Sequence, residues 1–405
     1  MQNAGNTLFK ALVASAFAAM SANVARAQFY TVTDLGTVSG PLSNAKGLNS
    51  DGQVAGVSIV ASSNFHAAIW DAGAVDLGTI GADTQSIAYS INDAGATVGV
   101  SYNYGDLQPH AFLWQAGVLT SLGQFSPHDI NNAGVVVGHR VVFKAGTLWI
   151  DQACQWNAGT LADLTTLGGD SSQAFAINGT GAIAGQSFLA DNMTVRACLW
   201  MSGIAHDLGT LAGTATAKSV AMDLNGAGQV VGWSDTGGGV MRACLFNVDG
   251  AGQVTGRVDL GALDGSSSVA FGVNSAGVIV GSSSYRGFIW DAGVMTDLNT
   301  LIPQGLGWKI TRAVAINDDG VIAADGDLLG FTHAVLLTPT ACVKGDVNAD
   351  GLVNALDIQA MVSVIVEGGS VWETCAGDVA APNDGAATTA DISAFVQCLL
   401  SGSCG

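Results

Sequence analysis

"INNAGVVVG", residues 130–138, carries the pattern that decides the fold of this chain. An apolar residue, an asparagine, two variable residues and a glycine precede a short apolar run, and this pattern occurs seven times at spacings of 39 to 49 residues. The asparagines are Asn49, Asn92, Asn131, Asn178, Asn225, Asn274 and Asn317. Self-similarity at such a period is typical of repeat architectures.

Each repeat reads as four short strands. The first ends at the asparagine, and an Asn-x-x-Gly turn leads to the second; asparagine and glycine both tolerate the positive φ angles that tight turns need. A third strand such as "HAFLW" and a fourth such as "VDLGTI" follow. Four strands per repeat of this length predict one blade of a β-propeller. The sequence therefore predicts an all-β, seven-bladed propeller over residues 28–340.

The two ends of the repeat array favour a closed ring. The last repeat stops after its third strand, "THAVLLTP", and the missing fourth strand is found at the other end, as "FYTVTDLG" at residues 29–36. An N-terminal strand that completes the last blade would remove the open sheet edges. The alternative, a linear β-solenoid, gives no reason for the displaced strand.

A compact residue lies four positions before each asparagine, which we attribute to crowding of the inner strands around the central axis. These residues are Ala45, Ala88, Pro127, Ala174, Ala221, Ala270 and Ala313.

The third strands carry two further sets of equivalent residues, which share a face with the aromatic residue that ends the strand. Four positions before that residue lie His66, His110, Gln152, Arg196, Arg242, Arg286 and His333. This set is interpreted either as a ring that binds an anion or sugar, or as structural partners of neighbouring strands and of Asp34, Asp76, Asp163, Asp207, Asp259 and Asp297. Because a residue that recurs in every blade is usually structural, the second interpretation is favoured.

The terminal aromatic residues are interpreted in the same way, as core between blades in preference to a sugar-binding platform. They are Trp70, Trp114, Trp156, Trp200, Phe246 and Trp290, with Leu337 in the last repeat. Cys154, Cys198 and Cys244 lie two positions before this slot, where other repeats have Phe, Ala or Val, so we expect small core residues and no zinc site.

The residue inventory gives no catalytic residue. Residues 28–340 contain no glutamate, and the chain has no Gly-x-Ser-x-Gly, His-Glu-x-x-His or phosphate-binding loop motif. The sequence therefore predicts a protein that is not an enzyme, with a polysaccharide-active hydrolase or lyase as the alternative.

Residues 1–27 have the features of an export signal. Lys10 precedes a short apolar core, and Ala25-Arg26-Ala27 is a small-x-small site with cleavage expected after Ala27. The net charge of −19 becomes −21 when Lys10 and Arg26 are removed with the signal. So negative a surface argues against nucleic acid as a partner. No apolar run reaches the roughly 18 residues of a membrane span, which predicts an exported protein without one.

The C-terminal segment, residues 341–405, contains a ladder of oxygen ligands. In "DVNADGLVNALD" the candidate ligands at loop positions 1, 3, 5, 7, 9 and 12 are Asp346, Asn348, Asp350, Leu352 through its carbonyl, Asn354 and Asp357. This arrangement, with glycine at position 6, predicts a calcium loop, and the next residues have the apolar spacing of a helix.

A second and less complete copy of the loop follows. Its candidate ligands are Asp384, Ala386, Thr388 and Asp391, and Asp378 is added only if two residues are inserted. Cys342, Cys375, Cys398 and Cys404 lie in this segment, and four cysteines allow three pairings, among which the sequence does not choose.

Two family resemblances follow from these motifs. The pattern "IN..G.VVG.S … HAFLW..G…DLGTL" resembles HAF-type extracellular repeats of bacteria, which implies export and a repeat fold but no established activity. The two loop-helix units resemble the type I dockerin domain, which implies calcium-dependent folding and attachment to a cohesin partner on a scaffold or cell surface. Together they predict an exported binding or scaffolding propeller, anchored by the C-terminal module, with carbohydrate as a candidate ligand.

Overall fold

The computed structural model describes residues 29–341 except 62, 107, 145–147 and 304–305, and in the C-terminal segment residues 344–347, 353, 356–367, 377, 379 and 386–401. The predicted signal, residues 1–27, lies outside the described residues. Among the residues that are described, no helix is both long and apolar enough to cross a membrane.

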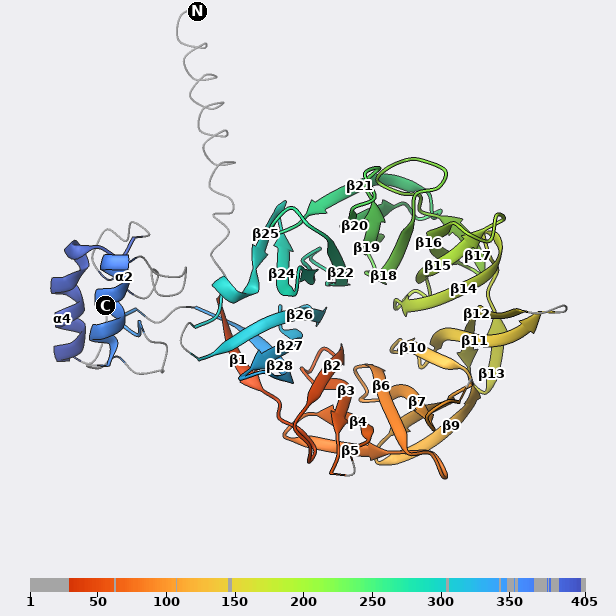
Figure 1. Ribbon diagram of the computed structural model, residues 1–405, viewed down its shortest axis with the longest axis horizontal. Helices are drawn as coiled ribbons and strands as arrows, with labels where there is room; N and C mark the ends of the chain where they lie inside the picture. Colours follow the sequence, from red (N-terminus) through yellow and green to blue (C-terminus); the bar gives the residue numbers. More distant parts are fainter. Residues whose placement is uncertain are drawn as a thin grey trace, which may run out of the picture.

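Seven four-stranded antiparallel sheets are arranged as the blades of a closed propeller (Figure 1). Blade one contains β2 (Ser43–Leu48), β3 (Val54–Ile59), β4 (Phe65–Trp70) and β5 (Ala74–Gly78). Blade two contains β6 (Gln85–Ile91), β7 (Thr97–Tyr102), β8 (His110–Gln115) and β9 (Val118–Gln124). Blade three contains β10 (Ser126–Ile130), β11 (Val136–Lys144), β12 (Leu148–Asn157) and β13 (Thr160–Asp163). Blades four and five contain β14 (Gly168–Ile177), β15 (Ile183–Leu189), β16 (Val195–Met201), β17 (Ile204–Asp207); and β18 (Ser219–Leu224), β19 (Gln229–Asp235), β20 (Met241–Val248), β21 (Val254–Gly261).

The last two blades complete the ring. Blade six contains β22 (Ser268–Val273), β23 (Ile279–Ser283), β24 (Arg286–Asp291) and β25 (Val294–Asp297), and the short helix η1 (Leu298–Thr300) follows it. Blade seven contains β26 (Trp308–Ile316), β27 (Ile322–Leu328), β28 (Phe331–Thr340) and the N-terminal β1 (Phe29–Asp34). The predicted propeller of four-stranded blades is confirmed.

The closing strand lies where the sequence predicts it. β1 pairs antiparallel with β28, from Phe29 opposite Thr340 to Asp34 opposite Val335. Phe29 and Tyr30 are buried, and the Tyr30 amide donates to the Leu301 carbonyl at 2.9 Å. The first and last parts of the repeat array are thereby held in one sheet, and the β-solenoid alternative is wrong.

The repeated asparagines form a ring of hydrogen bonds around the propeller axis. Each side-chain amide donates to the backbone carbonyl of the asparagine in the next blade, over 2.9 to 3.3 Å, and Asn317 returns the ring to Asn49. The side-chain oxygen also accepts backbone amides of its own turn, as at Ala94 and Ala96 for Asn92. The positive φ of each turn is supplied by its glycine, such as Gly95 at +73°, and not by its asparagine. Asparagine is needed here for its side-chain amide.

The core lies between neighbouring blades and includes the slots predicted from the third strands. The residues two positions before the terminal aromatic are all fully buried: Ala68, Phe112, Cys154, Cys198, Cys244, Phe288 and Val335. Trp70, Trp200, Phe246 and Leu337 are also buried, whereas Trp114, Trp156 and Trp290 are half-buried at the edges of core clusters. The interpretation of both slots as core is confirmed.

The compact residues before the asparagines are buried against the preceding blade and do not face the axis. Ala45 packs in one cluster with Ala323 and Ala334 of blade seven. The small size is therefore required by contact between blades, which corrects the explanation by crowding at the axis.

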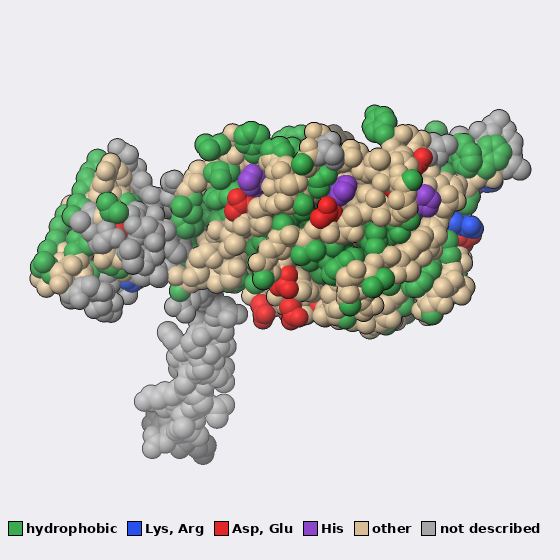
Figure 2. Space-filling model, turned by 90° about the horizontal axis from the view of Figure 1, so that it is seen from below, with side chains coloured by type: hydrophobic (Ala, Val, Ile, Leu, Met, Phe, Trp, Pro, Cys, Tyr) green, Lys and Arg blue, Asp and Glu red, His purple; other side chains and the backbone are tan. Residues whose placement is uncertain are grey.

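The C-terminal segment contains helices α2 (Asp357–Glu367) and α4 (Ile392–Ser401), with the short helix η2 (Thr389–Asp391) between them. Met361 and Val364 of α2 pack with Phe395 of α4 and with Val347 in a small core. The helices lie outside the ring (Figure 1), and Figure 2 shows the flattened propeller from the side.

A chain that begins at Leu35 tests the closing strand against one that begins at Gln28. Removing β1 exposes the edge of β28 and the surfaces that bury Phe29 and Tyr30. We expect a lower melting temperature and concentration-dependent association, because an open edge pairs with other chains. Thermal unfolding and light scattering measure both, and equal melting temperatures for the two chains would contradict closure by β1.

Candidate functional site

The central channel is the candidate site, and a β-bulge builds it in every blade. The register of each inner strand skips one residue three positions before the repeated asparagine, as between Ala45 and Gly47 or Ala221 and Asp223. A bulge re-aims a side chain out of the regular alternation. The skipped residues are Lys46, Tyr89, His128, Phe175, Met222, Phe271 and Val314, and all seven line one central cavity.

This cavity has a volume of about 220 Å³, and Arg312 completes its lining. A groove of about 840 Å³ shares Phe271 and Arg312 with it and extends over the start of the inner strands in blades six and seven. A third cavity of about 320 Å³ lies at the opposite end, against the asparagine ring. The central cavity, with three aromatic rings in its lining, thus adjoins the groove at Phe271 and Arg312, whereas the third cavity shares no lining residue with either.

Lys46 has a distinctive environment in this cavity. It makes no hydrogen bond or ion pair with any residue that the structure describes, whereas Arg312 beside it bonds the Asp325 carboxylate at 2.6 and 3.0 Å. Burial is the main cause that lowers the pKa of Lys46, and the positive charge of Arg312 lowers it further, although Asp325 opposes this. The Arg312 guanidinium also lies 5.8 Å from the centre of the Phe271 ring. The ammonium group of Lys46 therefore lies in a cavity lined by aromatic rings, beside the ion pair of Arg312 and Asp325.

His128 belongs to a chain of polar groups that leads away from the cavity. Its Nε2 lies 3.0 Å from Nδ1 of His139, whose Nε2 is 3.9 Å from the Asp151 carboxylate. Burial, with a smaller contribution from His139, lowers the pKa of His128 to about 3. His128 is consequently neutral near pH 7, packs edge-on against Phe175 and adds no charge to the cavity.

Two aspartates on the inner strands link neighbouring blades. Asp129 accepts from the Ile177 amide at 2.7 Å and from the Ser90 hydroxyl at 2.6 Å, and Asp223 accepts from the Val273 amide at 2.8 Å. Burial raises the pKa of both carboxyls, that of Asp223 to about 7. Their bonds to backbone amides of the next blade indicate a structural role.

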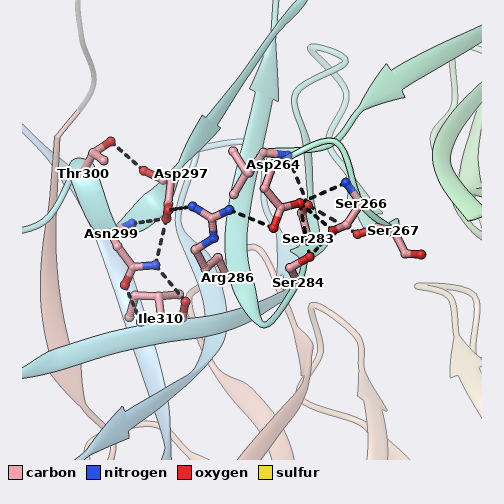
Figure 3. Close-up of polar contacts among 11 residues, drawn as sticks. Asp264, Ser266, Ser267, Ser283, Ser284, Arg286, Asp297, Asn299, Thr300 and Ile310 are labelled. Atoms are coloured by element: carbon pink, nitrogen blue, oxygen red, sulfur yellow. Dashed lines mark hydrogen bonds and ion pairs between the residues drawn. The ribbon is translucent and has the colours of Figure 1, made fainter.

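The ring of basic and polar residues on the third strands is likewise structural. His66 and His333 bond the repeated Asp76 and Asp34 at 3.0 and 2.9 Å, and Figure 2 shows histidines beside acidic side chains on the rim. Arg286 lies between Asp297 and Asp264, at 3.3 and 3.4 Å, in a network that includes Ser266 and Ser284 (Figure 3).

The remaining members of this ring mainly bond other neighbouring groups in place of the repeated aspartates. His110 bonds Asp83 at 2.9 Å, and Gln152 and Arg242 bond backbone carbonyls. Asp163 pairs with Arg140. The Arg196 Nε lies 3.8 Å from Asp207, but its second terminal nitrogen bonds the Thr214 and Ala215 carbonyls. Because these groups bond neighbouring elements, the structural interpretation is favoured over the anion-binding one.

The predicted calcium ligands are described only in part. Asn348, Asp350, Leu352, Asn354, Asp378 and Asp384 lie outside the described residues. Asp346 and Asp357 of the first loop are buried, and so is Asp391 of the second. Within the described part of the chain, no group of three or more His, Cys, Asp or Glu residues has a metal-binding arrangement.

Two predicted ligands of the second loop bond each other. The Asp391 carboxylate accepts from the Thr388 amide at 2.9 Å and from its hydroxyl at 3.2 Å, and Thr388 caps η2 in return. This capping box accounts for both residues without a metal.

Cys398 forms a disulfide, and Cys154, Cys198 and Cys244 are free and buried, as predicted for the latter three.

The site residues that the sequence reasoning missed are those of the channel. A signal was present, because the residue three positions before each asparagine differs from blade to blade and is Lys, Tyr, His, Phe, Met, Phe or Val. Strict alternation along the strand does not predict that the side chain at this position faces the axis. The bulge that turns the side chain toward the axis has no sequence signature of its own.

The fold places the chain among β-propellers. Three similar solved structures are TolB from Acinetobacter baumannii (11% identity, 71% of this chain and 63% of that chain, TM-score 0.37), a gluconolactonase from Xanthomonas campestris (10%, 76% and 89%, 0.39) and an acylaminoacyl peptidase from Pyrococcus horikoshii (10%, 74% and 52%, 0.40). The chain thus spans less than two thirds of the TolB and peptidase chains. No model of a protein family and no curated protein matches it.

Asp223 predicts a specific pH dependence of stability. Its pKa is about 7 when folded, against roughly 3.9 in an unfolded chain. Between these values the folded state binds a proton that the unfolded state lacks, so the contribution of Asp223 is largest below pH 4 and is lost as the pH rises through 7. We expect Asp223→Asn to reduce the fall in unfolding free energy between pH 4 and 8.

Denaturant titrations across that pH range measure this effect. Asp51→Asn, which changes an exposed aspartate in a turn, is the control and should leave the wild-type slope unchanged. Identical pH slopes for Asp223→Asn and the wild type would contradict a raised pKa at Asp223.

Proposed function

We propose that the protein is an exported binding propeller that a calcium-dependent, dockerin-like module tethers to a cohesin-like partner on a scaffold or cell surface. The observation that carries the proposal is the pair of buried carboxylates at the first and last positions of the first loop, Asp346 at 2% and Asp357 at 0% exposure. Two carboxylates buried in a small module carry a desolvation cost, which calcium coordination would offset.

The donor chemistry of the first loop fits calcium. Its side chains and the Leu352 carbonyl supply oxygen only, at the spacing of an EF-hand-like loop, and a hard cation of this size prefers six to eight oxygens. The second loop fits less well, because Thr388 and Asp391 already satisfy each other. We therefore assign the main calcium site to the first loop.

The two helices offer a surface for a protein partner. On α2, Ile358, Val362 and Val366 recur every four residues and are 47%, 55% and 74% exposed. On α4, Ile392, Val396 and Leu400 have the same spacing and are 45%, 44% and 77% exposed. An apolar stripe on each of two helices of one small module is typical of a protein-binding surface. It supports attachment through this module.

Binding by the propeller is favoured over polysaccharide cleavage. The carboxylates of Asp129 and Asp223 bond backbone amides of the next blade, and that of Asp325 bonds Arg312 and the Ala45 amide. Groups so engaged are poorly placed as the paired acid and base of a glycosidase. Export rests on the predicted signal at residues 1–27.

Calorimetric titration of the full-length protein with calcium tests the anchor. We expect heat of binding in the wild type, loss of most of it in Asp346→Ala and Asp357→Ala, and a smaller loss in Asp391→Ala. Asp51→Ala removes one exposed negative charge from the propeller and is the control. Absence of calcium binding to the wild type would overturn the proposal.

A further inference from the structure

We propose that the central cavity binds a small carboxylate whose ring lies against the aromatic side chains and whose charge meets Lys46. The inference deepens the proposed function, since it names the ligand of the propeller. It depends on the propeller alone and not on the calcium module.

The first argument is the cost of Lys46 without a ligand. Removing an ammonium group from bulk water is unfavourable unless it is paired, and Lys46 has no partner among the described residues. The lowered pKa reports the same cost. Asp325 is the acidic residue whose charge acts on Lys46, but its carboxylate is already bound by Arg312 and by the Ala45 amide. Lys46 therefore shares the charge of Asp325 and has no counter-ion of its own.

The second argument is the chemistry of the other six bulge residues. Tyr89, Phe175 and Phe271 present aromatic rings, Met222 and Val314 are apolar, and His128 is held neutral. A simple inorganic anion gains nothing from such a lining. A ring with an apolar face gains free energy when it is buried against this lining, and its carboxylate supplies the missing counter-charge.

The third argument is that these residues differ from blade to blade. The asparagines and turn glycines repeat because each blade needs them, and the buried slot of the third strand stays apolar in every blade. The bulge position carries Lys, Tyr, His, Phe, Met, Phe and Val in turn. The seven side chains at this position differ in chemistry and line one cavity. Such a lining can recognise a single ligand that is itself asymmetric. The size of that cavity, about 220 Å³, suits one ring, and the adjoining groove of about 840 Å³ gives access.

Two sources of this chemistry, an aromatic acid and a uronic acid, are separated by isothermal titration of the full-length protein. Benzoate and galacturonate are the charged probes, benzyl alcohol and galactose their neutral counterparts, and acetate the carboxylate without a ring. We expect one of the two charged rings to bind at least tenfold more tightly than its neutral counterpart and than acetate. Whichever binds identifies the source, and failure of both to bind would overturn the proposal.

Variants of Lys46 test the role of the charge. Lys46→Met should weaken binding of the charged probe at least tenfold, whereas Lys46→Arg should retain it. Lys309→Met, an exposed lysine on β26, is the control and should bind as the wild type does. Lys46→Gln replaces the methionine variant if that variant does not fold. Unchanged affinity after removal of the charge would overturn the proposal.

The melting temperature separates this role from a structural one. Removing a desolvated and unpaired charge should leave the melting temperature of Lys46→Met equal to or above that of the wild type, while binding is lost. A lower melting temperature together with retained binding would show that Lys46 serves the fold. Calcium titration of the same variants reports the anchor separately, so failure of the channel and failure of the tether are distinguishable.

Discussion

Seven asparagine side chains, each donating to the backbone of the next blade, hold the inner strands of the propeller in a closed circle. Each asparagine also accepts amides of its own turn, so one side chain fixes both the turn and the contact with the next blade. Six of the seven asparagines are buried and Asn178 is half-buried, and a buried amide left unpaired is costly. The bond from Asn317 to Asn49 closes the circle, because it joins the seventh blade to the first.

The channel follows from this arrangement. With the asparagine fixed at the end of each inner strand, the bulge three residues earlier falls at the same height in all blades. The inner strands then direct one side chain each to a common centre. The positions that hold the ring together repeat, whereas the positions that face the channel differ. In each inner strand the asparagine thus holds the ring together, and the bulge residue three positions earlier faces the cavity.

The sequence was sufficient for the features that repeat. The number of blades, the closing strand at residues 29–34, and the burial of Cys154, Cys198 and Cys244 follow from periodicity and from which residue types share a slot. The side-chain ring of the asparagines could not be predicted, since a hydrogen bond to a residue some 40 positions away leaves no local signal. The channel was missed because strict alternation conceals a bulge. In the sequence nothing distinguishes Lys46 from a lysine on the surface, and only the fold places it in the central cavity.

The central claim is that closure makes the seven blades one cooperative unit, and hydrogen exchange of Asn178→Ala measures this most directly. The substitution removes one link of the ring, at 3.2 Å, and the bonds to the Thr180 and Ala182 amides, a loss of roughly 1–3 kcal/mol. Asn157→Ala, at an exposed position, is the control. We predict that protection of slowly exchanging amides falls by a similar amount in all seven blades, including β27 and β28. A loss confined to blades four and five would contradict the closed ring as the basis of the fold.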